Sequence, residues 1–94
     1  MNIPIEDGAA RARHELVLRL KRVEGQLRGV QRMIEEGEDC EPIAQQLSAS
    51  RKALDKAFFE LLACAIEHPE FTMNQKETKD RRIQRMARAL ARLA

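Results

Sequence analysis

The side chains in this sequence that could do chemistry are two cysteines and two histidines: Cys40, Cys64, His14 and His68. Thiolates and imidazoles bind soft transition-metal ions, and a thiolate can also attack electrophilic sulfur. Two cysteines and two histidines are too few for a convincing zinc site within one chain. A site completed across a subunit interface stays open at this point.

Cys40 stands where a helix is expected to begin. It follows Asp39, a good N-cap, and precedes Pro42, which the first helical turn tolerates. The positive end of a helix dipole stabilises a thiolate, so we interpret Cys40 as reactive, the alternative being a small apolar plug at a corner. Cys64 lies on an apolar helix face, where a buried small hydrophobe is the commoner role. His68 is more often a charge at a helix C-terminus than a ligand.

Motifs of enzymes are missing from the sequence. It has no Gly-rich phosphate loop, no serine-nucleophile motif and no His-Glu-x-x-His helix, so we predict no enzymatic activity. Two cysteines without a signal peptide do not form a disulfide framework, and no apolar run is long enough to span a membrane. We therefore expect a single cytoplasmic domain with reduced thiols.

Two long segments, at about 9–36 and 40–68, have the apolar spacing of amphipathic helices. On each we expect one continuous apolar seam: Leu16, Leu20, Val23, Leu27, Val30 and Ile34 on the first, and Ile43, Leu47, Ser50, Leu54, Ala57, Leu61 and Cys64 on the second. The short turn at Gly37 predicts an antiparallel hairpin in an all-α fold. Such a thin hairpin leaves apolar surface uncovered and favours a partner chain.

The remaining segments complete a three-helix prediction. Residues 1–8 are expected to be a flexible arm, with Asp7 as a candidate cap, and residues 9–94 a single domain. Asn74 and Glu77 form a variant of a capping box before a third helix at about 75–93. Gly25 and Gly29, four residues apart in a helix, favour close approach of another backbone.

Charge is unevenly distributed along the chain. Residues 9–36 carry a net charge of +3, residues 37–70 of −4, and residues 79–94 of +5. Basic side chains share helix faces at one-turn spacing; they are Arg19 with Arg22, Lys52 with Lys56 beside Arg51, and Arg81, Arg85, Arg88 and Arg92. This segregation suits a polyanionic partner, although ordinary solvated helix faces are the alternative.

The run from Arg19 to Val30, continued by Met33 to Cys40, resembles the CsoR/RcnR/FrmR family of small helical bacterial repressors, and Gln46 to Arg51 resembles its second helix. The resemblance covers about residues 12–68. It implies a dimer with a four-helix core, usually a dimer of dimers. It also implies double-stranded operator DNA as the partner. By position, the DNA contacts would include Arg19, Arg22 and Lys56, and we add the neighbouring Arg51 and Lys52.

Members of this family sense copper, nickel or cobalt, formaldehyde or sulfane sulfur. At the positions where copper-sensing relatives follow the hinge cysteine with a histidine and a second cysteine, this chain has Ala65 and Pro69. Formaldehyde-sensing relatives use an N-terminal proline amine, whereas this chain begins Met-Asn-Ile-Pro. Persulfide-sensing relatives share the Ser48-Ala49-Ser50 run, and their second cysteine falls at position 69 rather than 64.

Our first hypothesis is a homo-oligomeric repressor that releases DNA when Cys40 is modified by a signal such as sulfane sulfur, with Cys64 of the partner subunit as second thiol. The alternative within the family is a Cu(I) or Ni/Co sensor with a non-standard site drawn from Cys40, Cys64 and His68 or His14. From another class, a helical adaptor without specific DNA binding remains open. No cofactor is certain; a transition metal such as Cu(I) is the candidate.

Overall fold

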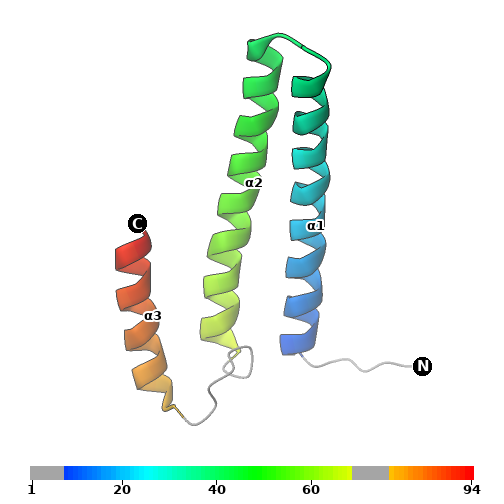
Figure 1. Cartoon of the computed structure of the whole chain (residues 1–94). Helices are drawn as coiled ribbons and strands as arrows, with labels where there is room; N and C mark the ends of the chain where they lie inside the picture. The colour runs from blue at the N-terminus through cyan, green and yellow to red at the C-terminus, as the bar shows by residue number, and fades with distance from the viewer. Residues whose placement is uncertain (1–7, 69–76) are drawn as a thin grey trace, which may run out of the picture.

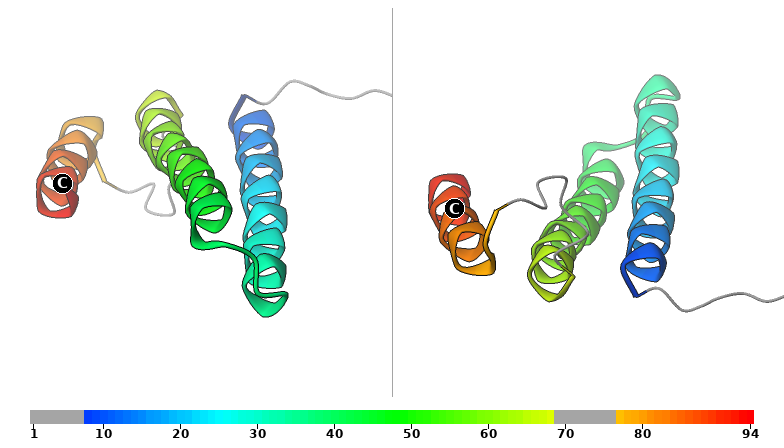
Figure 2. Two further views of the ribbon diagram at one scale, coloured as in Figure 1. Left: turned by 90° about the horizontal axis from the view of Figure 1, so that it is seen from above. Right: turned by 90° about the horizontal axis from the view of Figure 1, so that it is seen from below.

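The computed structural model describes residues 8–68 and 77–94, and all regular structure in these two ranges is helical (Figure 1). Helix α1 spans Gly8–Glu35, α2 spans Cys40–Glu67 and α3 spans Lys79–Leu93. The first two have 28 residues each and are therefore about 42 Å long. They run antiparallel beside each other in all views (Figures 1 and 2), which confirms the predicted all-α fold with a helical hairpin.

The hinge of the hairpin, residues 36–39, ends α1 with a Schellman motif. Gly37 adopts φ +73°, the left-handed conformation that glycine tolerates best. The amide of Glu38 donates to the carbonyl of Met33 at 3.0 Å, and that of Gly37 donates to Ile34 at 3.1 Å. These bonds satisfy carbonyls that the helix end would otherwise leave unpaired. The turn predicted from Gly37 is thus fixed by its backbone.

Asp39 is the N-cap residue of α2, as the sequence predicts, but its side chain makes no capping hydrogen bond. Helix α3 begins at Lys79, later than the expected start near residue 75. Thr78 is its N-cap, and its Oγ1 accepts a hydrogen bond from the amide of Arg81 at 3.2 Å. The predicted caps Asp7 and Asn74, and residues 1–7 of the predicted arm, lie outside the described residues.

The contact between α1 and α2 is narrow and repeats every seven residues. We call it the inner seam; its buried members are Ala9, Leu16, Val23 and Val30 on α1 and Ser50, Ala57 and Cys64 on α2. Most of these side chains are small, so each adds little apolar area to the contact. The one hydroxyl among them is satisfied, because Ser50 Oγ donates to the Gln46 carbonyl at 3.0 Å.

A second apolar stripe runs beside the inner seam and is exposed. This outer stripe consists of Leu20, Leu27 and Ile34 on α1 and Leu47, Leu54 and Leu61 on α2. Five members lie four residues after an inner-seam residue, and Leu47 lies three residues before Ser50, so the stripe follows the same side of both helices. The predicted apolar face is therefore present on each helix, but the two halves of it differ in burial. This chain covers the inner seam and leaves the outer stripe exposed.

Helix α3 stands apart from the hairpin (Figures 1 and 2). Its apolar edge is uncovered, with Ile83, Leu90 and Leu93 all exposed. Gly25 and Gly29 have no backbone against them, since a Cβ at Gly25 would meet only the Arg28 side chain and one at Gly29 would meet nothing within 4 Å. The predicted close approach of a backbone does not occur within the described chain. None of the three described helices could cross a membrane.

Candidate thiol site and nucleic-acid interface

Cys40 is the first residue of α2, and its side chain is exposed. The hinge positions it there, because α1 ends at Glu35 and the backbone bonds of Gly37 and Glu38 turn the chain. Nothing in the inner seam or the outer stripe covers this corner. A small reagent in solution can therefore reach the Cys40 sulfur directly.

Cys64 is in the opposite environment, on the inner seam near the other end of α2, which we call the foot of the hairpin. Its side chain is only 8% exposed. Burial raises the pKa of the Cys64 thiol, and the nearby carboxylates Glu60, Glu67 and Glu15 raise the pKa further. Cys64 therefore keeps its proton more firmly than a free cysteine does, which agrees with its interpretation as a small buried hydrophobe.

The two predicted sensing cysteines cannot meet within one chain. They lie at opposite ends of α2, 24 residues and hence about 36 Å apart along the axis. A disulfide needs Cα atoms within about 7 Å. Any covalent link between Cys40 and Cys64 must therefore join two chains.

A hollow of about 330 Å³ lies at the foot. It is lined by Gly8, Arg11, Ala12, Glu15, Glu60, Ala63, Cys64, Glu67 and His68. His68 is the C-cap residue of α2, and its ring lies so close to α1 that a Cβ on Gly8 would come within 2.7 Å of His68 Cε1. The structure thus brings Cys64 and His68 to one hollow and leaves Cys40 at the hinge. His14 is exposed and does not line this hollow.

One chain alone does not assemble the predicted metal site. Within residues 8–68 and 77–94, no three side chains of histidine, cysteine, aspartate or glutamate come together as metal ligands. Ala65, at the position where the family resemblance expects a ligating histidine, is buried and offers no donor atom. Pro69, at the position of the second cysteine, lies outside the described residues. A Cu(I) site within one chain is therefore not supported.

Four of the five predicted DNA contacts lie on one side of the hairpin. Arg22 follows Arg19 by one turn on α1, and Lys52 precedes Lys56 by one turn on α2. We call Arg19, Arg22, Lys52 and Lys56 the basic face; of these, all but Arg19 are exposed. Arg19 lies three residues after the inner-seam Leu16, so this face flanks the seam on the side away from the outer stripe.

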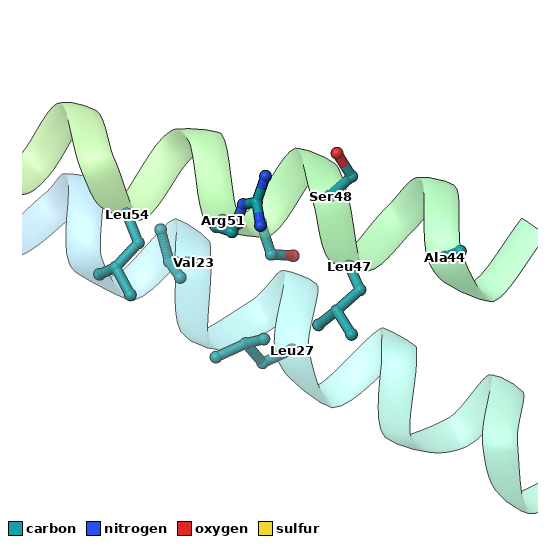
Figure 3. A pocket seen from close by; sticks show the side chains of 8 residues that line it. Val23, Leu27, Ala44, Leu47, Ser48, Arg51 and Leu54 are labelled. Carbon is teal, nitrogen blue, oxygen red and sulfur yellow. The ribbon is translucent and has the colours of Figure 1, made fainter.

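Arg51, the fifth predicted DNA contact, belongs to a different surface. It lines a groove of about 540 Å³ together with Val23, Leu27, Ala44, Leu47, Ser48, Ser50 and Leu54. Figure 3 shows Leu47 and Leu54 from α2 and Leu27 from α1 in this groove, with Arg51 between the two α2 leucines. Arg51 therefore accompanies the outer stripe rather than the basic face.

Arg19 is engaged by an acidic residue that the sequence analysis did not single out. Its Nε lies 2.7 Å from Glu60 Oε1, which joins α1 to α2 across the edge of the inner seam. Glu60 follows the inner-seam Ala57 by three residues, as Arg19 follows Leu16. Aligning the two seven-residue patterns in antiparallel register is the signal that could have found this pair.

A second ion pair neutralises one arginine of the basic stripe of α3. Arg85 donates from Nε to both carboxylate oxygens of Glu77, at 3.2 and 3.0 Å, and from Nη2 to Oε1 at 2.6 Å. These hydrogen bonds lower the pKa of Glu77. Arg85 thus fastens the segment before α3 to its second turn. Arg81, Arg88 and Arg92 are the exposed arginines of the predicted stripe that carry no such fork.

Comparison with known proteins gives a consistent result. Residues 12–92 match the profile of the family described as metal-sensitive transcriptional repressor. Over 50 residues the chain is 46% identical to the copper-sensing transcriptional repressor RicR of Mycobacterium tuberculosis (strain ATCC 25618 / H37Rv), covering 53% of this chain and 52% of the relative. Over 60 residues it is 35% identical to the copper-sensing transcriptional repressor CsoR of Bacillus subtilis (strain 168), covering 64% and 59%.

The chain spans between half and two thirds of the length of these curated relatives, and no solved structure matches it. The family profile nevertheless covers most of the sequence, including the Arg19–Cys40 run on which the resemblance rests. Its description is that of a repressor rather than an enzyme, in line with the prediction of no enzymatic activity. The chain belongs to the family of metal-sensitive transcriptional repressors.

Proposed function

We propose that this chain is a homo-oligomeric transcriptional repressor that releases operator DNA when Cys40 is modified by a thiol-reactive signal such as sulfane sulfur. The observation that supports the proposal is the exposed Cys40 at the start of α2. Ala65 stands at a family ligand position without a donor atom. What Cys40 retains is its reactivity as a thiol.

The proposed chemistry takes two steps. The Cys40 thiolate attacks the terminal sulfur of a persulfide, RS–SH; a persulfide forms on Cys40, the RS–SH bond breaks, and RS⁻ leaves and takes a proton to become RSH. Cys64 of the partner subunit then gives its proton to water and attacks the Cys40 sulfur, so that a disulfide forms and hydrogen sulfide leaves. Two thiols are oxidised and one persulfide is reduced. The raised pKa of Cys64 lowers the fraction of its thiolate near neutral pH, and this slows the second step.

A second copy of this chain is the partner that the outer stripe suits. Six exposed aliphatic side chains follow one side of both helices for most of the length of the hairpin. Two hairpins packed through these stripes would form a four-helix core. If the paired α2 helices run antiparallel, the hinge of one protomer lies near the foot of the other. That arrangement would bring Cys40 towards Cys64 of the partner subunit.

DNA binding is proposed to use the basic face of Arg19, Arg22, Lys52 and Lys56. Their guanidinium and ammonium groups suit phosphate oxygens, and an oligomer would repeat the face along a duplex. Because such binding depends on neutralising phosphates, it should weaken steeply with salt. Arg22→Ala should reduce affinity for all sequences and lower the salt slope by about one. Unchanged binding by this variant would contradict the placement of the face.

A metal sensor is the second candidate, and a specific observation favours it. Both relatives named above are described as copper-sensing repressors. In this chain a site would have to combine Cys40 of one protomer with Cys64 or His68 of the partner subunit, because one chain separates them. Titration of the reduced protein with Cu(I), followed by the thiolate-to-metal absorption band, tests this candidate. A stoichiometric band that disappears in Cys40→Ala would favour it.

The function is tested by fluorescence anisotropy of the reduced protein on a labelled duplex from the region upstream of its own gene. Measurements are repeated after polysulfide, after Cu(I), and with Cys40→Ala. We expect tight binding that polysulfide abolishes in the wild type and leaves intact in Cys40→Ala. Loss of binding with Cu(I) alone would favour the metal sensor. The absence of sequence-specific binding in every state would refute the repressor proposal.

A further inference from the structure

The ion pair between Arg19 and Glu60 sets an acidic group directly against the proposed DNA-binding surface. Arg19 Nε lies 2.7 Å from Glu60 Oε1, and the two side chains are 30% and 27% exposed. Along α2, Glu60 follows Lys56 by one turn, so the carboxylate continues the same side of the helix as Lys52 and Lys56. An anion at this position opposes the phosphates that the rest of the face would attract.

The geometry of the pair makes it exchangeable. Although the Nε–Oε1 distance is short, the buried Nε–H of Arg19 is not aligned with any acceptor among the described residues. The contact is thus mainly Coulombic, without the directed hydrogen bond that strengthens an arginine–carboxylate fork. Partly exposed ion pairs of this kind are weak. A phosphate could therefore replace Glu60 at Arg19.

We propose that Glu60 is an internal competitor of DNA phosphate for Arg19, so that this ion pair sets how tightly the repressor binds DNA. The inference depends on the proposed DNA-binding function. In the free protein, Glu60 neutralises Arg19 and holds it at the edge of the seam. On DNA, Arg19 turns to a phosphate and Glu60 is left beside it.

Glu60 also connects the basic face to the foot of the hairpin. It precedes Cys64 by one turn of α2 and lines the same hollow as Cys64 and His68. Arg19, at the other side of the pair, belongs to α1. A change at the foot that moves α2 relative to α1 would lengthen or shorten the Arg19–Glu60 contact. It would thereby change the fraction of Arg19 side chains that are free to bind DNA. Glu60 is in this sense a positioning residue.

The test compares Glu60→Gln with Glu67→Gln on the duplex described above. Both variants raise the net charge by one, and Glu67 lies one seven-residue repeat beyond Glu60 on α2, away from Arg19. We expect Glu60→Gln to bind about two- to fivefold tighter than Glu67→Gln at the same salt. Glu60→Asp keeps the charge but withdraws the carboxylate by one methylene; it should bind tighter than wild type, by less than Glu60→Gln does.

Arg19 must carry the gain if the proposal is right. In the Arg19→Ala background, the gain of Glu60→Gln over Glu67→Gln should therefore shrink to what the direct repulsion between the Glu60 carboxylate and phosphate contributes. With Arg19 present, a Glu60→Gln variant that binds no tighter than Glu67→Gln would overturn the proposal. The DNA-binding function would still stand if the wild type binds the duplex specifically. Failure of all variants, wild type included, to bind the duplex specifically would overturn both. Far-UV circular dichroism checks that each variant keeps its helices.

Discussion

The two ends of the hairpin place the same functional group in opposite surroundings. At the hinge, Cys40 opens α2 and is exposed, whereas at the foot Cys64 is buried on the inner seam among carboxylates. The difference follows from position along the helix. Cys40 is at the start of a helix and lies outside the packed seam. Cys64 follows Ser50 and Ala57 at seven-residue spacing and lies inside the seam. The accessible thiol is therefore at the hinge, and the packed thiol is at the foot.

The foot depends on the inner seam, so removing a seam side chain there should have the largest effect. Leu16→Ala deletes a buried side chain, and we expect a loss of about 2–3 kcal/mol in the free energy of unfolding, measured in urea. Leu18→Ala is the matched control, because Leu18 is 40% exposed on the same helix. It should cost less than about 1 kcal/mol. Equal losses from the two variants would contradict the seam.

The contrast between the thiols should appear directly in their chemical reactivity. Near neutral pH we expect iodoacetamide to alkylate Cys40 at least about tenfold faster than Cys64, because the buried thiol is both protonated and shielded. Peptide mass spectrometry over time gives the two rates. In concentrated urea the difference should disappear. Faster alkylation of Cys64 in the folded protein would reverse the assignment of the reactive end.

The smallest expected effect is a dependence of stability on alkaline pH. In the unfolded chain the Cys64 thiol ionises with a pKa of about 8.5. In the folded chain the pKa of Cys64 is higher, so the thiol keeps its proton to higher pH. This contribution is fully present below the pKa of the unfolded thiol and is lost as pH rises through the raised pKa of the folded one. Wild type should therefore lose stability above about pH 8.5 more steeply than Cys64→Ala does. Parallel curves from urea unfolding would show that Cys64 does not titrate this way.

Local sequence signals predicted the hinge well. Gly37 marked the turn and Asp39 the start of α2, because helix ends depend on the conformation and chemistry of a few adjacent residues. The burial of Cys64 also followed from its spacing. The residue type of Asp39 did not reveal that its side chain makes no capping hydrogen bond. The start of α3 was also harder to predict, because Asn74 and Thr78 both carry oxygens that suit an N-cap.

The arrangement across the hairpin was harder to predict from the sequence. Leu20 and Leu16 both fit an apolar helix face, and only the partner helix decides which of them is buried. Arg51 likewise counted as basic by type, whereas packing placed it in the apolar groove. The Arg19–Glu60 pair joins residues far apart in sequence, so no local pattern reveals it. The sensing and DNA-binding roles depend on a second chain and on DNA, and they stay proposals.

The central claim is that Cys40 and Cys64 act together only between chains, and a mixed-protomer cross-link tests it most directly. Cys40→Ala and Cys64→Ala chains, one of them carrying a size tag, are mixed, treated with polysulfide and separated without reductant. We predict a mixed-size dimer that joins the remaining Cys40 to the remaining Cys64. Either variant treated alone should give no cross-linked dimer. A monomer-sized wild-type species holding a disulfide between its own Cys40 and Cys64 would contradict the hairpin and the account built on it.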